Sequence, residues 1–433
     1  MWPNALGRQQ TRLSLRNYIA QINFAGCLTM LYRICHTFGC WFHASGQLLT
    51  ANVVMENVSS TPQVDQHDPE FLATVCLAML PKLGPRTLIS LLEFFGDAQS
   101  VLKAEGPQLA QVPGVGPKLI HTIRTAHHHV DLEGVLAWCA DNDSQIVVRG
   151  RDGYPDRLDD LPDAPPMLFV RGEVTDQDAL SVAIVGTRHA THYGLKQAER
   201  FGYALARAGV TVVSGLARGI DTAAHEGALA AGGRTLAVLG SGLGQIYPGE
   251  NKGLAAAIAA DGAVISEYAP HAKPRGGMFP QRNRLIAGLS LATLVVEAPD
   301  RSGALMTARL AGEQNREVLA VPGNVTNRAS RGCNQLIRDG ATLVQNIDDV
   351  LEALGPMRSS VTTTDGHEVR NASELQLNDV ERKILGAIDA ESTAIDAVIE
   401  RSQLPAHQVI ATISVLEMKR LIRRISGQFI SRI

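Results

Sequence analysis

A cluster of cationic and amide side chains occupies positions 282 to 284, where Arg282, Asn283 and Arg284 introduce an apolar stretch with helical spacing. Guanidinium groups bind phosphate oxygens in a planar, bidentate geometry, and the first turn of a helix adds unpaired backbone amides. The pattern therefore predicts an anion site with phosphate as its ligand. Because residues two positions apart cannot share one helix face, we expect one arginine to meet the ligand. The other is expected to pair with an internal carboxylate, either Glu297 or Asp221.

Two turns upstream have the same chemical character, because each follows a short apolar run and precedes a helical pattern. They are Gly186-Thr187-Arg188 and Ser214-Gly215-Leu216-Ala217-Arg218-Gly219-Ile220-Asp221. A strand, a glycine-rich turn and a helix form a phosphate cradle in α/β proteins. Both turns supply glycines for close backbone approach, a hydroxyl group and an arginine. We expect them to converge with residues 282–284, and Lys273 and Arg275 in the preceding loop to add charge.

The residues around these turns favour binding over catalysis. Asp221 is expected to cap its own helix, and Glu297 to form a structural ion pair because no second acid or metal ligand accompanies it. His189, His192 and His225 are expected near the same rim, but no serine or cysteine nucleophile pairs with them. The G-x-G-x-x-G spacing of dinucleotide sites and the G-x-x-x-x-G-K-[ST] phosphate loop are both absent from the sequence. We therefore expect no cofactor, no metal and no enzymatic step.

The composition limits the kinds of partner that the chain can bind. The chain has 433 residues, a formal net charge of −3 and a pI near 6.5, so any binding of nucleic acid must come from local charge. Its 45% hydrophobic content is enough for two or three packed domains. The six cysteines lack the spacing of a zinc site, which fits reduced thiols in the cytoplasm. Residues 18–34 are too short and too polar for a membrane span.

Alternating strand and helix patterns organise the central domain, residues 151–354. The expected strands are residues 167–170, 180–185, 210–213, 235–239, 263–266, 291–297, 318–321 and 342–344. Helical patterns such as residues 193–208 and 304–314 lie between most of them. This alternation predicts an α/β fold with a doubly wound, mostly parallel sheet. Ligands bind beyond the carboxyl ends of such strands, where Gly186, Ser214 and Glu297 fall.

Smaller domains are expected on both sides. Residues 70–150 have helical spacing and a turn at 112–119 with the glycines of a helix-hairpin-helix, which either contacts DNA phosphates or only joins helices. Polar residues 355–374 predict a flexible linker. Residues 375–433 predict a winged helix of three helices and two strands, and its weakly polar third helix favours protein contact or packing over DNA reading. Residues 1–60 form an atypical extension, and we expect translation to begin near Met55.

Several ordered motifs together resemble the DprA/Smf family of DNA-processing proteins, over about residues 72–433. Besides the turns above, they are Tyr247-Pro248 with Asn251, Phe279 to Ser290, Ser302-Gly303-Ala304 with Thr307-Ala308, and Pro322-Gly323 before Ser330, Gly332, Asn334, Leu336 and Ile337. The resemblance implies an extended Rossmann-like domain that binds single-stranded DNA and forms a homodimer. It further implies that the protein protects incoming DNA and loads the RecA recombinase during natural transformation, with no established enzymatic step.

The resemblance also implies a set of DNA-binding residues by motif position. They are Gly186, Thr187, Arg188, Ser214, Gly215, Arg218, Gly219, Arg282, Asn283 and Arg284, with Lys273 and Arg275 added by charge alone. Threonine stands at position 187 where the family frequently has serine, which keeps the hydroxyl group. The long amino-terminal extension departs from the family pattern.

Two other functions stay open at this stage. A Rossmann-type nucleotide phosphoribohydrolase has a related sheet, but its Pro-Gly-Gly-x-Gly-Thr loop is broken here at Pro322-Gly323-Asn324. An adaptor protein would keep the pocket as a vestige and bind other proteins through its outer domains. Loss of DNA affinity in the isolated central domain would favour the adaptor.

Overall fold

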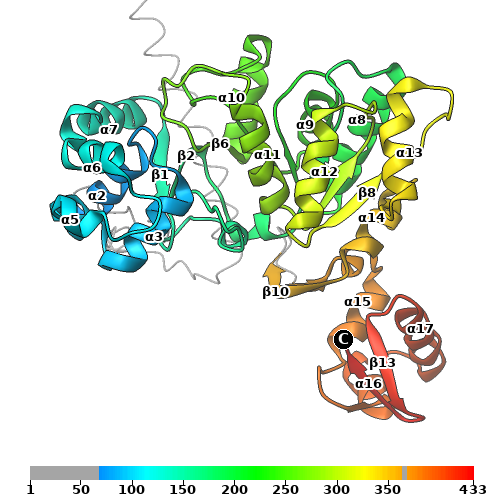
Figure 1. The fold of residues 1–433 in the computed structure, drawn as a ribbon. Coiled ribbons are helices and arrows are strands. Elements are labelled where there is room, and N and C mark those ends of the chain that lie inside the picture. Colours follow the sequence, from blue (N-terminus) through cyan, green and yellow to red (C-terminus); the bar gives the residue numbers. More distant parts are fainter. Residues whose placement is uncertain (1–67, 363–367) are drawn as a thin grey trace, which may run out of the picture. The chain divides into compact units, whose positions relative to one another are not determined.

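The computed structural model of the chain describes residues 68–362 and 368–433 (Figure 1). The expected extension at residues 1–60 and the expected start near Met55 lie outside these residues. The first part of the described chain is helical. Its helices are α2 (Pro69–Ala78), α3 (Pro85–Phe95), α4 (Ala98–Lys103), α5 (Gly106–Leu109), α6 (Pro117–Arg124) and α7 (Leu132–Asp141). A proline opens α2, α3 and α6, where its missing N–H leaves no helix hydrogen bond unmade.

A nine-stranded sheet follows, in the order β1-β2-β6-β5-β4-β3-β7-β8-β9. Its strands are β1 (Ser144–Val148), β2 (Met167–Gly172), β3 (Ser181–Val185), β4 (Thr211–Ser214), β5 (Thr235–Val238), β6 (Ala263–Ser266), β7 (Ala292–Val295), β8 (Glu317–Ala320) and β9 (Thr342–Leu343). All neighbours from β6 to β9 are parallel, whereas β2 runs antiparallel to β6 and β1 antiparallel to β2. The strand order reverses between β3 and β7, which confirms the predicted doubly wound, mostly parallel sheet.

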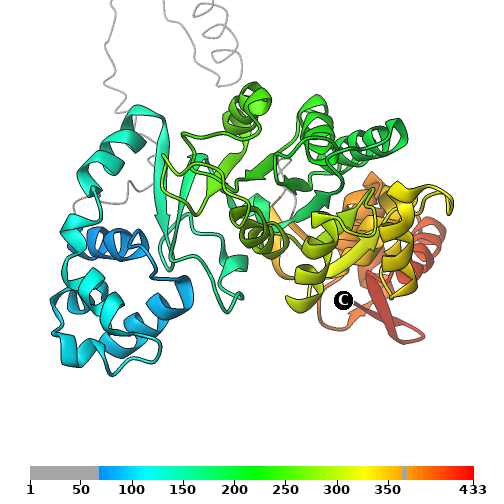
Figure 2. The same cartoon turned by 45° about the horizontal axis from the view of Figure 1, so that its top comes forward.

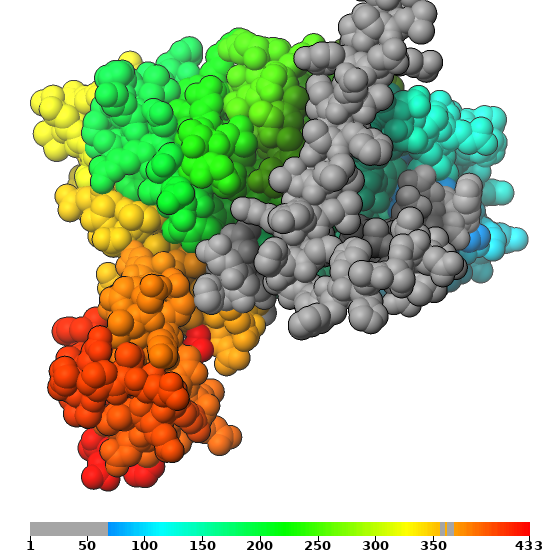
Figure 3. Space-filling view, turned by 180° about the vertical axis from the view of Figure 1, so that it is seen from behind, coloured from blue at the N-terminus to red at the C-terminus, as the bar shows by residue number. Residues whose placement is uncertain are grey.

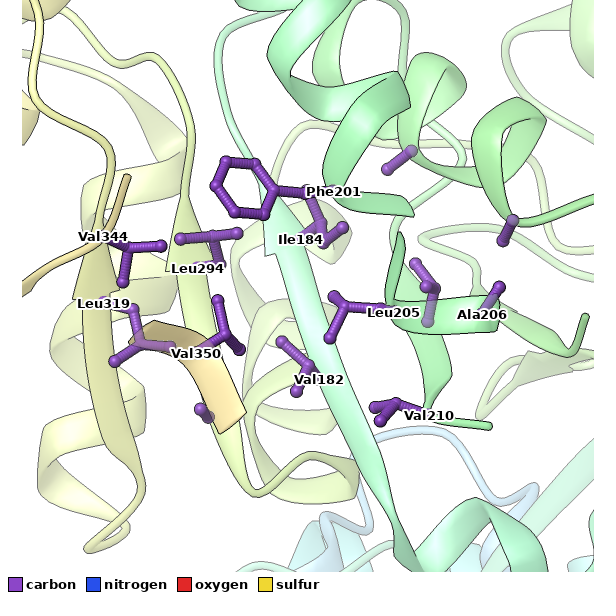
Figure 4. Packing of buried hydrophobic residues seen from close by; sticks show 14 of the residues in the cluster. Val182, Ile184, Phe201, Leu205, Ala206, Val210, Leu294, Leu319, Val344 and Val350 are labelled. Atoms are coloured by element: carbon purple, nitrogen blue, oxygen red, sulfur yellow. The ribbon is translucent and has the colours of Figure 1, made fainter. Parts of the chain in front are cut away.

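Helices cover both faces of this sheet (Figures 1 and 2). They are α8 (His192–Arg207), α9 (Ile220–Ala230), α10 (Lys252–Asp261), α11 (Met278–Leu289), α12 (Gly303–Glu313), α13 (Arg331–Arg338) and α14 (Ile347–Leu354). On one face, Val182 and Ile184 of β3 pack against Phe201 and Leu205 of α8 (Figure 4). The alternate residues of β3 face α11 and α12, because successive side chains of a strand point to opposite sides. Both faces are therefore buried.

Two segments differ from the expectation. Strand β1 falls at the end of the region predicted to be helical, because its short apolar run carries too little periodicity to be recognised. It pairs with β2, and its Ile146 and Val148 share a core with Phe71 and Val75 of α2. The segment expected to be a flexible linker contains β10 (Pro356–Thr362), β11 (Glu368–Asn371) and the 3-10 helix η6 (Ala372–Gln376). Buried Val361 and Val369 pair across these strands, and Val361 also joins the core of the sheet domain together with Ala372 of η6.

The described chain ends in a small domain with its own core. Its elements are α15 (Asp379–Gly386), β12 (Thr393–Ala394), α16 (Ile395–Ser402), α17 (Ala406–Met418), β13 (Ile422–Ser426) and β14 (Phe429–Arg432). The strands form a sheet in the order β12-β14-β13, as the predicted winged helix requires. Buried Ile384, Val398 and Ile413 bring the three helices together. Across residues 68–362 and 368–433, no helix has both the length and the apolar character needed to cross a membrane.

Candidate functional site

Arg188 lies at the carboxyl end of β3, in the loop that leads into α8. Its side chain is exposed, and its guanidinium carbon lies 5.2 Å from the centroid of the Phe279 ring. Within the described part of the chain, no carboxylate forms an ion pair with this guanidinium. A cation over an aromatic face is stabilised by the ring quadrupole, and this contact leaves much of the guanidinium edge open to a ligand. Arg188 is therefore an oriented cation that has no ion-pair partner among the described residues.

Two aromatic rings continue this surface. The Tyr247 and Phe279 rings have centroids 5.7 Å apart and planes inclined by 50°. Tyr247 is exposed and Phe279 half-buried, so both keep accessible ring surface. Together with neighbouring loops they form what we name the Arg188 pocket, which is lined by Arg188, Gly215, Ala217, Arg218, Tyr247, Pro248, Phe279 and Arg282. Neither ring was among the predicted site residues, because Tyr247 and Phe279 are far apart in the sequence and no local pattern marks two aromatic residues that meet in the fold.

Arg282 forms the floor of this pocket. Its side chain is 4% exposed, and its Nη1 atom donates to the carbonyl oxygens of Gly215, at 2.7 Å, and of Val238. A Cβ atom at Gly215 would overlap the guanidinium, so this glycine serves an internal contact instead of a ligand. Burial lowers the pKa of Arg282 to about 10, although the charge of Asp221 opposes this shift. The group stays protonated at neutral pH and places a positive charge beneath the pocket.

The expected phosphate cradle at residues 214–221 is occupied by the protein itself. One carboxylate oxygen of Asp221 accepts hydrogen bonds from the backbone amides of Gly215, at 3.2 Å, and Ala217, at 3.3 Å. The hydroxyl of Ser214 donates to the carbonyl of Ile184. Asp221 therefore stabilises the loop that precedes its helix through these two hydrogen bonds, whereas we expected it to cap the helix. These amides are not free for a phosphate, and the loop contributes shape and the Arg218 side chain instead.

The two arginines of the 282–284 motif have different surroundings. They lie in the second turn of α11, which begins at Met278, so the helix starts earlier than expected. Arg284 is 9% exposed and pairs with Glu267 and, at 3.5 Å, with Asp163. The predicted internal carboxylate therefore exists, but it is neither Glu297 nor Asp221. Glu297 instead accepts from the backbone amide and hydroxyl of Thr191 at 2.8 and 2.7 Å, and no ion pair to it is found among the described residues.

The remaining predicted residues divide between the pocket and its surroundings. Arg218 is exposed and forms a two-point ion pair with Glu250, with 2.7 Å between Nη2 and Oε2. Lys273 and Arg275 are exposed in the segment before α11 and outside the pocket lining. His225, expected at the rim, is fully buried and bonds to Thr235 at 2.7 Å, because it lies on the packed face of α9.

A larger cavity of about 560 Å³ adjoins the Arg188 pocket at the point where the strand order reverses, and we name it the switch-point groove. Residues Gly186, Thr187, Arg188, His189 and Asp221 line it from one half of the sheet. Asn283, Arg301, Ser302, Gly303 and Thr307 line it from the other half. Its cations outnumber its one carboxylate, Asp221, so the groove favours an anionic ligand. No group of three His, Cys, Asp or Glu side chains within residues 68–362 and 368–433 could hold a metal ion.

The buried carboxyl of Asp221 predicts a pH dependence of stability. Burial raises its pKa from 3.8 to about 6, against the attraction of Arg282. An acid with a raised folded-state pKa contributes stability that is present below its unfolded pKa and is lost as pH rises through the folded value. The stability of Asp221→Asn relative to wild type should therefore rise between pH 4 and 6, by up to ~1.4 kcal/mol per pH unit. Thermal unfolding of both proteins at each pH measures this change in relative stability. A stability difference between the two proteins that stays constant with pH would contradict the prediction.

The fold and this site define a class of protein: an extended Rossmann-like α/β protein whose crevice at the strand-order switch combines cations with aromatic faces. The family model for DNA recombination-mediator protein A matches residues 145–355, and the model for the DprA winged helix domain matches residues 368–428. The chain belongs to the DprA/Smf family of DNA-processing proteins, as the sequence motifs indicated.

Individual relatives agree with this assignment. The chain is 34% identical to Protein Smf of Synechocystis over 375 residues, which cover 80% of this chain and 94% of that protein. It is 45% identical to DNA processing protein DprA of Streptococcus pneumoniae over 200 residues, covering 46% of this chain and 71% of the relative. The X-ray structure of DprA from Streptococcus pneumoniae superposes with a TM-score of 0.56 at 34% identity, covering 65% of this chain and 96% of that structure.

Proposed function

We propose that this chain binds single-stranded DNA across the Arg188 pocket and the switch-point groove. The observation that carries the proposal is the Arg188 guanidinium, which lies over the Phe279 ring without an ion-pair partner in the described chain. Arginine supplies charge for a phosphate, and the neighbouring ring supplies a face for a base. A nucleotide presents both groups within one residue.

The ring faces favour a single strand over a duplex. In a duplex each base face is covered by its neighbours, so stacking on a protein ring requires an unpaired base. Tyr247 and Phe279 supply two inclined rings within one pocket. Side chains that could read base edges are few here, and Asn283 is engaged with the carbonyl of Gly303 at 3.4 Å. We therefore expect little dependence on base sequence.

The contact residues follow from exposure and pairing. We assign direct contact to Arg188, Phe279 and Tyr247, with Arg282 acting through its charge below the pocket. Arg218 must first exchange Glu250 for a phosphate, so its net contribution is expected to be smaller. The remaining predicted residues are assigned to support or to the flanks: Gly186, Thr187, Ser214, Gly215, Gly219 and Arg284 shape the site, and Lys273 and Arg275 extend its charge.

The wider role in the proposal rests on the family. A recombination mediator holds single strands, and we propose that this protein protects incoming DNA and loads RecA during natural transformation, as a cytoplasmic homodimer. We also propose that it binds without catalysis, since the one carboxylate in the groove, Asp221, is already bonded to two backbone amides. The phosphoribohydrolase alternative would need an acid that is free to act on the ligand.

The test is fluorescence anisotropy of a labelled oligothymidine and of its duplex counterpart, in a salt series. Arg188→Ala is expected to weaken single-strand binding by roughly tenfold at moderate salt, since one charge-assisted contact to an exposed phosphate is lost. The slope of log K against log salt should fall in magnitude by about 0.7, the value for one phosphate contact on a single strand. Arg309→Ala is the control, because Arg309 is an exposed arginine already paired with Glu313. Equal slopes for wild type and Arg188→Ala would exclude a direct phosphate contact.

A further inference from the structure

Helix α8 has an outward face that the pocket does not use. Five exposed residues lie on it at helical spacing: Tyr193, Lys196, Arg200, Tyr203 and Arg207. At 100° per residue they fall within about 80° of one another, opposite the buried face of the helix. The stripe contains cations and aromatic rings alone, and Glu199 lies just beside it. We name these five residues the α8 stripe.

The cations of the stripe are not neutralised by neighbours. Lys196, Arg200 and Arg207 form no ion pair with any described residue. Tyr193 and Tyr203 are 47% and 46% exposed, a large fraction for aromatic side chains on a packed helix. Seen from behind, atoms in the green that the bar gives to this part of the sequence lie on the visible surface (Figure 3).

The stripe is continuous in sequence with the site. His189 lines the switch-point groove, and α8 begins three residues later at His192. From Tyr193 to Arg207 the helix rises by roughly 21 Å, at 1.5 Å per residue. A stacked strand has one phosphate per 3.4 Å, so the stripe matches about six phosphates. A helix face that carries both cations and aromatic rings fits a ligand that carries both phosphates and exposed bases.

We propose that the α8 stripe is a second track for single-stranded DNA, along which a strand bound in the Arg188 pocket continues. This inference rests on the proposed function of the pocket. Lys196, Arg200 and Arg207 bind three phosphates along the strand. Tyr203 provides a stacking face between Arg200 and Arg207, and Tyr193 provides one before Lys196. The consequence is a length dependence: a strand that fills only the pocket gains nothing from the stripe, whereas a longer strand does.

The test compares two oligothymidines in anisotropy titrations. One has about six nucleotides, near the lower end of the site sizes typical of single-strand binders, and the other about twenty-five, beyond their upper end. The variant Lys196→Glu/Arg200→Glu/Arg207→Glu is expected to keep the short-strand affinity within about threefold of wild type and to lose the extra affinity for the long strand. Its salt slope on the long strand should fall in magnitude by about 2, for three lost phosphate contacts. Tyr193→Ser/Tyr203→Ser should weaken long-strand binding with an unchanged salt slope.

The control is Lys103→Glu/Arg309→Glu/Lys383→Glu, which changes the net charge equally at exposed positions outside α8. An equal loss in this control would show a general field effect and overturn the inference. Unchanged affinity of the stripe variant for the long strand would also overturn the inference. A molar mass of the stripe variant that differs from wild type in light scattering would overturn it too, because it would show that the stripe is a protein interface. Absence of binding by wild type to both strands would refute the proposed function itself.

Discussion

Replacing Arg282 with methionine is expected to lower the free energy of unfolding by about 3 to 5 kcal/mol, because a buried charged group is removed together with the two hydrogen bonds that it donates. The change leaves the carbonyls of Gly215 and Val238 without their donor. It also removes the positive charge that stabilises ionised Asp221 in a fully buried position. For a sheet domain of this size, scanning calorimetry should show a melting temperature lower by roughly 6 to 20 °C.

A double-mutant cycle gives this prediction its control. Asp221→Asn removes the buried charge, so the cost of Arg282→Met should be smaller in that background than in the wild type. Additive effects would show that the two groups act independently and would contradict the coupling described here. The alternative variant Arg282→Lys keeps the charge, but its shorter side chain is expected to place the ammonium short of the two carbonyls to which Nη1 of Arg282 donates. The free energy of unfolding of Arg282→Lys should therefore lie between those of wild type and Arg282→Met.

Replacing Phe279 with alanine is expected to weaken single-strand binding by about 5- to 150-fold, because stacking of one base on a ring contributes about 1 to 3 kcal/mol. The same change removes the ring below Arg188 and leaves its guanidinium less well oriented. Since no charge is lost, the salt slope should match that of wild type. Phe279→Tyr keeps the ring and should bind nearly as well. Anisotropy titrations at two salt concentrations measure both quantities, and full affinity in Phe279→Ala would exclude base stacking at this ring.

The fold could be read from the sequence because its signals are local. Each buried strand is an apolar run bounded by a turn, and the helix patterns between the strands fix a parallel sheet. Strand β1 was not predicted because an apolar run as short as Ile146 to Val148 can equally belong to the end of a helix. The strands β10 and β11 were not predicted because their apolar residues, such as Val361 and Val369, are isolated in an otherwise polar segment and are buried only by tertiary packing.

The site was predicted only in part, because burial decides what a charged residue does. Arg282 and Arg284 are two positions apart and chemically identical in sequence, yet one forms the floor of the pocket and the other pairs with Glu267. Phe279 and Tyr247 meet only after the sheet has formed, and no local pattern marks their contact. The amides of the Gly215 turn follow the phosphate-cradle pattern, and only the structure shows that Asp221 already occupies them.

The Arg188 pocket takes its lining from segments that follow four different strands: the loops after β3, β4 and β5, and the start of helix α11 after β6. Arg188 and Phe279 are far apart in the chain, so their contact requires that the non-local strand pairs of the sheet be in place. An unfolded or half-assembled chain has no such site, and a ligand that binds there stabilises the native state selectively. If the pocket binds single-stranded DNA as proposed, the DNA would raise the stability of the folded domain increasingly as its free concentration rises, so the ligand would also help to keep its own binding site assembled.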